Sequence, residues 1–255
     1  MNGSATWLLT RRTLMQFPRN PMVVAFSSAP VLMIFLVFGT LFEGVRHAAG
    51  FPTDNYYEYL APMAILLTTV PGISQAADGL AADFQSRYFY KLMTTPASIG
   101  SIMLGRLLGD GVRLFVQAGA ILLLAMAFGA RVETGLPGAL LMLLIGTLFA
   151  LVTFGVLTAN LAIKSKDPAL IQAIFPMAFL MIFLTTGFQP LDQIESGVLK
   201  SIIDFNPTEL VLAPMRDLML SGYDWSDIGI AGLVIVGLAL IGVPLTVRNY
   251  RSVYR

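Results

Sequence analysis

Six long apolar stretches constrain most strongly what this chain can fold into. A helix needs about 20 apolar residues to cross the hydrocarbon core of a bilayer, and each stretch is close to that length or longer. The stretches are residues 22–42, 59–77, 107–128, 136–163, 169–188 and 228–247. Only 12% of the 255 residues are charged, about half the share in an average soluble domain. The sequence therefore predicts an all-α polytopic membrane protein, a single domain over residues 1–255 with six transmembrane helices.

The basic residues predict how these helices are oriented. If the N-terminus is cytoplasmic, four of the 16 Lys and Arg residues lie outside, namely Arg46, Arg131, Lys200 and Arg216. The other 12 are then cytoplasmic, which is the arrangement that the positive-inside rule favours. We therefore expect both termini in the cytoplasm.

The segment before the first stretch, residues 1–21, has a moderate amphipathic pattern. Trp7, Leu14 and Met15 would share one stripe of a helix. Arg11 falls in the same stripe, and its long stem can carry the charge to the lipid headgroups. We predict an interface helix along the cytoplasmic membrane surface, marked by Trp7, Arg11 and Arg12.

A short polar segment, DFQSRYFYKLMTTPAS at residues 83–98, separates the second and third stretches. Its pattern predicts a helix that starts near Asp83 and ends before Pro96, because the residue before a proline avoids the helical region. Four residues would share one stripe of that helix: Phe84, Tyr88, Lys91 and Leu92. Two interpretations fit, an interfacial helix whose aromatics rest at the headgroups and a handle gripped by another protein.

Residues 189–226 are not a plain loop. They lie between the first five spans, in residues 22–188, and the last span and tail, in residues 227–255. Two groups of apolar residues have helical spacing and are separated by Asn206–Pro207. We predict two short re-entrant helices at the outer face. They pack on the ends of the spans, form an outer gate, or do both, and the residues assigned to that gate are Phe205, Asn206, Pro207 and Arg216.

The third stretch begins with three charges, Arg106, Asp110 and Arg113, which lie on one helix face. Charges at membrane depth are costly and raise a functional hypothesis. These charges can also pair with one another, because residues three and four apart are neighbours on a helix. An ion-pair ladder and a polar entry to a transport pathway are therefore both open.

Several classes of function are excluded by what the sequence lacks. It has no cysteine and a single histidine, His47, so thiolate chemistry and His-pair metal sites are absent. It has no glycine-rich phosphate loop, so we expect no ATPase site and no cofactor on this chain. A net charge of +1 indicates no nucleic-acid partner.

The sequence resembles the ABC-2 type transporter permeases, especially the drug-resistance membrane subunits similar to the daunorubicin exporter. The resemblance covers nearly the whole chain. It is most specific between the second and third stretches, at Asp83, Arg87, Tyr88, Phe89, Lys91, Leu92, Thr95–Pro96 and Gly105–Arg106. It continues in Arg19-x-Pro21 and in Phe205–Asn206–Pro207 followed by Arg216 and Gly222. The family often has a proline where this chain has Ile194–Glu195–Ser196, which leaves the start of the first outer helix open.

The resemblance implies roles for these segments. The polar segment would be a coupling helix held in a groove of a separately encoded cytoplasmic ATPase, with the N-terminal helix beside it. The coupling residues would be Asp83, Phe84, Arg87, Tyr88, Phe89, Lys91, Leu92, Thr95 and Pro96. Two permease subunits would pair above two ATPase subunits that bind ATP and Mg, and would move substrate outward across the plasma membrane of a bacterium.

The substrate is constrained only by the composition of the spans. They are rich in Met, Phe and Leu and contain no array of charges, which favours a hydrophobic or amphipathic substrate such as an antibiotic or a lipid. A polysaccharide or glycolipid exporter of the same family is one alternative. An ATP-independent secondary transporter is another.

Overall fold

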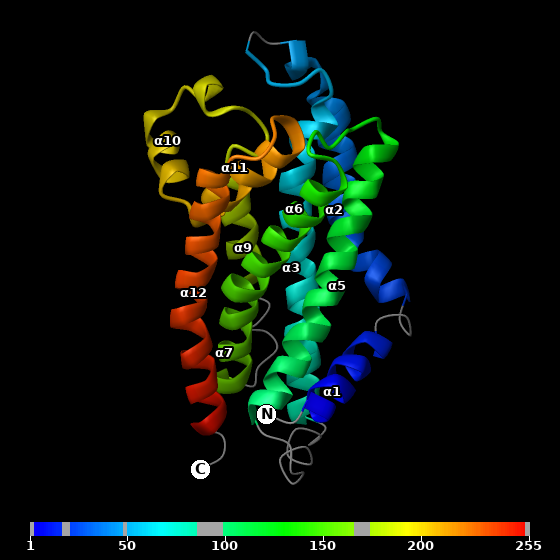
Figure 1. The fold of residues 1–255 in the computed structure, drawn as a ribbon, viewed down its shortest axis with the longest axis vertical. Coiled ribbons are helices and arrows are strands. Elements are labelled where there is room, and N and C mark those ends of the chain that lie inside the picture. Colours follow the sequence, from blue (N-terminus) through cyan, green and yellow to red (C-terminus); the bar gives the residue numbers. More distant parts are fainter. Residues whose placement is uncertain (1–2, 17–20, 48–49, 86–98, 166–173, 253–255) are drawn as a thin grey trace.

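The computed structural model describes residues 3–16, 21–47, 50–85, 99–165 and 174–252, and within these ranges every regular element is a helix. The long helices run along one axis of an elongated bundle (Figure 1). They are α2 (Pro21–Leu41), α3 (Tyr56–Gln85), α5 (Ile99–Ala127), α6 (Gly135–Ala150), α7 (Val156–Ser165), α9 (Ile174–Phe183) and α12 (Trp225–Ser252).

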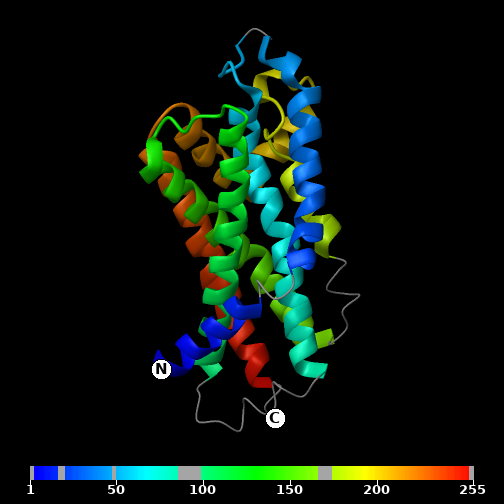
Figure 2. The same ribbon diagram turned by 90° about the vertical axis from the view of Figure 1, so that its right-hand side faces the viewer.

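Short helices gather at the two ends of this bundle. One end carries α10 (Gly197–Asp204), α11 (Pro207–Leu220) and the 3₁₀ turns η1 (Glu43–His47) and η3 (Leu191–Gln193). We call it the outer end, following the predicted orientation. At the opposite, inner end, where α12 also ends, α1 (Gly3–Gln16) lies obliquely against α5 (Figure 2). The two outer helices and the N-terminal helix that the sequence predicts are therefore present.

Helix α3 is the centre of the bundle. It packs against α2, α5, α6, α7, α9 and α11, and its side chains from Tyr59 to Val70 are all buried. This stretch is apolar on every side, which is the pattern of a helix enclosed by others. The helix runs through Gln85, beyond the predicted end at residue 77, because the alanine-rich sequence that follows favours a helix.

Three described helical stretches are long and apolar enough to cross a membrane: Leu104–Ala127, Gly135–Thr158 and Trp225–Asn249. A shorter apolar stretch, Ala29–Leu41, belongs to α2. Large apolar side chains point away from the protein, such as Leu233, which is 74% exposed. A water-soluble monomer rarely exposes patches of this kind, so the protein is integral to a membrane. The count of six spans stays a prediction.

The fourth predicted span is one continuous helical run with an irregular centre. Helices α6 and α7 are joined by the π-helical turn η2 (Leu151–Gly155). Such a turn rotates the faces of the two halves relative to each other. Prolines do not break the neighbouring helices, since Pro30 lies inside α2 and Pro244 inside α12.

Candidate functional site

Asn206 connects the end of α9 to the start of α11 at the outer end. Its Oδ1 accepts a hydrogen bond from the backbone N–H of Thr208 at 2.9 Å, which caps α11. Its Nδ2 donates to the carbonyl oxygens of Met181 at 2.7 Å and Leu184 at 2.6 Å. The last carbonyls of a helix have no partner within the helix, so this buried amide satisfies one helix end while it starts the next.

The fifth predicted span, residues 169–188, ends earlier in the structure than the prediction. Helix α9 ends at Phe183, and the backbone from 184 to 188 is irregular. The reason is that side chains from α3 and α11 take up the backbone groups of this segment. At Gly187 a Cβ atom would collide with the side chain of Met63, so α3 also approaches too closely for a larger residue.

Thr186 is the hub of these interactions. The Glu209 carboxylate accepts hydrogen bonds from the Thr186 N–H, at 2.8 Å, and from the Thr186 hydroxyl. The Thr186 carbonyl accepts from the Tyr59 hydroxyl at 2.7 Å and from Nη2 of Arg216 at 2.9 Å. The Arg216 guanidinium also lies 4.4 Å from the centroid of the Tyr59 ring, within the range of a cation–π contact. We call Tyr59, Thr186, Asn206, Glu209 and Arg216 the outer cluster.

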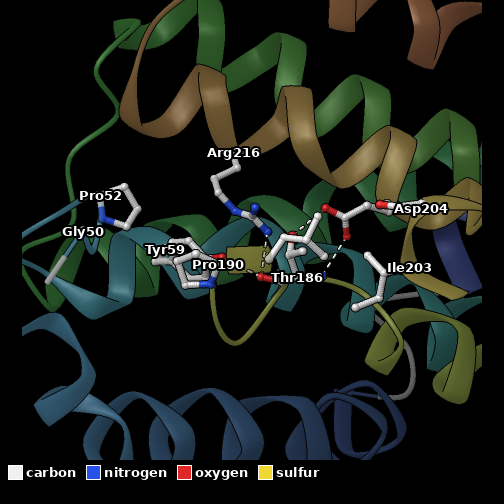
Figure 3. A pocket seen from close by; sticks show the side chains of 10 residues that line it. Gly50, Pro52, Tyr59, Thr186, Pro190, Ile203, Asp204 and Arg216 are labelled. Carbon is white, nitrogen blue, oxygen red and sulfur yellow. Dashed lines mark hydrogen bonds between the residues drawn. The ribbon is translucent and has the colours of Figure 1, made fainter. Parts of the chain in front are cut away.

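A pocket of about 280 Å³ opens beside the outer cluster (Figure 3). Tyr59, Thr186, Glu209 and Arg216 form its polar side. The remaining lining residues are Gly50, Pro52, Pro190, Leu191, Ile203 and Asp204. The volume is near the lower limit of small-molecule sites, so the pocket can hold a part of a drug-sized molecule.

The residues predicted for an outer gate are only partly together. Asn206 and Arg216 belong to the outer cluster, and Pro207 occupies the first turn of α11, where its missing N–H costs nothing. Phe205 is 88% exposed and is not among the residues that line the pocket. Its side chain points out at the corner between α10 and α11, and the assignment of Phe205 to a gate stays a prediction.

The ionised carboxylate of Asp217, next to Arg216 on α11, is electrostatically disfavoured in the folded protein. Burial raises the pKa of this carboxyl, the carboxylates of Asp227 and Asp224 raise it further, and Arg216 opposes them. Three acids thus lie near one another at the start of α12 and the end of α11.

At the inner end, α1 is fixed to the start of α5. The Thr10 hydroxyl donates to the carbonyl oxygen of Gly105 at 3.0 Å. A Cβ atom at Gly105 would lie 2.8 Å from both Leu9 Cβ and the Thr6 carbonyl oxygen, so only glycine permits this approach. Trp7, in the same helix, is 63% exposed, and its contact with the membrane surface stays a prediction.

Of the basic residues of the interface helix, Arg11 is exposed and Arg12 is half-buried. This placement agrees with the predicted stripe, in which Arg11 accompanies Trp7.

The three charges of α5 form the predicted ion pairs. Arg106 Nε lies 3.8 Å from Asp110 Oδ2, and Arg113 Nη2 lies 3.7 Å from Asp110 Oδ1. Asp110 is buried, and a buried carboxylate is tolerated only when it is paired. The ladder accounts for all three residues, and a role in a transport pathway stays a prediction.

The predicted coupling residues lie largely outside the described residues, namely Arg87, Tyr88, Phe89, Lys91, Leu92, Thr95 and Pro96. Asp83 and Phe84 are in the last turn of α3. The prediction that Asp83 starts a separate helix is therefore wrong, because α3 continues through Gln85.

A polar contact between α7 and α12 has no counterpart in the sequence predictions. Nδ2 of Asn160 donates to the Thr246 hydroxyl at 2.9 Å, and Nδ2 of Asn249 donates to Oδ1 of Asn160 at 2.6 Å. All three residues are buried. At the nearby Gly242, a Cβ atom would collide with the side chain of Val156, so glycine allows the two helices to approach this closely. Small residues and amide hydrogen bonds of this kind hold membrane helices together.

Sequence reasoning also missed Tyr59, Thr186 and Glu209. Glu209 carries a signal, because Asn206-x-x-Glu209 has the spacing of a capping box. Its carboxylate accepts a hydrogen bond from Thr186 instead of from the backbone N–H of the cap residue Asn206. Nothing in the sequence points to Thr186, whose role depends on the packing of α9 against α11.

Comparison with known proteins gives a consistent picture. The sequence model of the ABC-2 type transporter family matches residues 4–220. The chain is 24% identical, over 98% of its length and 87% of the other's, to the daunorubicin resistance ABC transporter permease protein DrrB1 of Streptomyces coeruleorubidus. It is 23% identical, over 97% and 89%, to a protein of Cyanophora paradoxa named as a transport permease, ycf38. It is 21% identical, over 97% and 88%, to a Mycobacterium tuberculosis protein named as a doxorubicin resistance ABC transporter permease, DrrC.

Proposed function

Because the chain belongs to the ABC-2 type transporter family, we propose that it is the membrane-spanning permease subunit of an ATP-driven exporter. In this proposal it crosses the plasma membrane six times with both termini in the cytoplasm. It pairs with a second permease subunit, and two copies of a separate ATPase supply ATP hydrolysis. The substrate is hydrophobic or amphipathic and moves outward.

The observation that carries the proposal is the continuity of α3. This helix has 30 residues, a length of about 45 Å at 1.5 Å per residue. Its outer end supplies Tyr59 to the outer cluster, and its inner end leads into the predicted coupling segment. A displacement of that segment by an ATPase would therefore act on one continuous helix whose far end holds Thr186.

The contact between α1 and α5 supports the same mechanism. The end of α3 and the start of α5, which flank the coupling segment, both lie at the inner end of the bundle (Figure 2). Helix α1 is fixed to α5 at that end through Thr10 and Gly105. An ATPase docked there would push on α3 and α5 together, with α1 bracing the start of α5.

The test is uptake of daunorubicin by inside-out membrane vesicles that contain the chain and its ATPase. The proposal predicts uptake that requires hydrolysable ATP and persists when ionophores abolish the ion gradients. Uptake that follows an ion gradient without ATP would indicate a secondary transporter. ATP-dependent uptake of a lipid-linked sugar but not of daunorubicin would indicate a glycolipid exporter.

A further inference from the structure

The pocket at the outer end combines apolar walls with a few charged groups. Pro52, Pro190, Leu191 and Ile203 supply the apolar walls, and they come from three separate segments of the chain. Sites for small molecules have this composition, with a few polar groups that fix the orientation of the ligand.

Arg216 has hydrogen-bonding capacity to spare. A guanidinium carries five N–H donors, and within the described part of the chain Arg216 makes one hydrogen bond, from Nη2 to Thr186. No ion pair of Arg216 is found among the described residues, because the Glu209 carboxylate is engaged by Thr186. The guanidinium can therefore donate to an oxygen atom of a ligand in the pocket.

The other charges favour a cationic ligand over an anionic one. Asp204 is exposed at the rim of the pocket, and Glu209 lies on the polar side. Two carboxylates and one guanidinium give the lining a net negative charge. A phosphate group could contact Arg216 but would be repelled by both acids, whereas an ammonium group can approach Asp204 directly.

We propose that this pocket is an outer binding site for amphipathic amines that carry a neutral acceptor oxygen on a ring system. The oxygen accepts from Arg216, the ring lies against Leu191 and Ile203, and the ammonium group lies near Asp204. At about 280 Å³ the pocket encloses one end of such a molecule and leaves the rest outside. The inference rests on the proposed export function and adds the place where the solute pauses before release.

The test measures binding to the purified chain in lipid nanodiscs, without ATPase or nucleotide. The probes are daunorubicin, which is an amine on a quinone ring system, and its neutral N-acetyl derivative. Leu191→Trp fills the pocket and should weaken binding of both probes at least tenfold. Arg216→Lys keeps the charge but loses the fork of donors, and should weaken both about fivefold or more, the range for a lost buried hydrogen bond.

Asp204→Asn tests the contribution of the ligand's amine to binding separately from that of the rest of the ligand. It should weaken daunorubicin about two- to fivefold, as for an exposed ion pair, and leave the N-acetyl derivative unchanged. Two matched controls lie at the same outer end but do not line the pocket. They are Val198→Trp, at a residue that is 74% exposed, and Glu133→Gln, at an exposed residue, and both should bind the probes as the unmodified chain does.

Three results would overturn the inference: no binding by the unmodified chain, unchanged affinity in Leu191→Trp, or displacement of the probe by anionic phospholipid with no effect of Asp204→Asn. The outcome is separable from that of the export test. ATP-dependent uptake without nanodisc binding removes this site and keeps the exporter. Binding without ATP-dependent uptake keeps the site and removes the exporter.

Discussion

Replacing Asn206 by alanine should destabilise the protein more than truncation of any other helix cap that the structure describes. The change removes the cap of α11 and both hydrogen bonds to the end of α9. A lost cap costs about 1 kcal/mol, and each lost buried hydrogen bond costs about 1 kcal/mol. The sum is about 3 kcal/mol, which lowers the melting temperature by about 6–12 °C at 2–4 °C per kcal/mol.

The assay is thermal unfolding in detergent, with two further variants that divide the effect. Asn206→Asp keeps the acceptor that caps α11 but loses both Nδ2 hydrogen bonds, so it should cost about 2 kcal/mol and lower the melting temperature by about 4–8 °C. Ser196→Ala is the matched control, because Ser196 caps α10 through one exposed bond of 3.4 Å, and should change the melting temperature by about 2 °C or less. Equal melting of Asn206→Ala and Ser196→Ala would refute the account of Asn206 as a link between two helices.

Three other changes test separate parts of the structure. Gly105→Ala should release α1 from α5 at a cost of about 1–3 kcal/mol, and a spin label on α1 should become more mobile. Gly232→Ala is the control and should leave the label unchanged, because a Cβ atom at Gly232 would have no atom within 4 Å. Asn160→Leu should cost about 1–2 kcal/mol of stability by breaking the contact of α7 with α12; unchanged melting would count against that contact. Asp217→Asn should raise stability at neutral pH and not at low pH. Folding raises the pKa of Asp217, so the native state loses stability as pH rises from the unfolded pKa through the folded one.

Much of the architecture follows from the sequence because a bilayer imposes a length on apolar helices. The predicted stretch at residues 228–247 lies inside α12, and the break at Asn206–Pro207 separates α10 from α11 as expected. The break depends on local chemistry, because proline and asparagine constrain the backbone at their own positions. The three charges on α5 also pair as their spacing predicts.

The outer cluster could not be predicted in the same way. Thr186 is an ordinary threonine in an apolar run, and it becomes a hub only because Tyr59 and Glu209 reach it from 127 and 23 residues away. The early end of α9 has the same origin. Hydropathy continues to residue 188, but side chains distant in the sequence bind the backbone beyond Phe183.

The central claim is that this chain works with a separate ATPase held at the coupling segment. The most direct test is to purify the chain from its native host in mild detergent and to identify copurifying proteins by mass spectrometry. The account predicts an ABC ATPase with the unmodified chain and with Lys200→Glu, a charge reversal at the outer end, and its loss with Arg87→Glu/Lys91→Glu. Absence of an ATPase from the unmodified sample, under conditions that preserve other membrane complexes, would contradict the account.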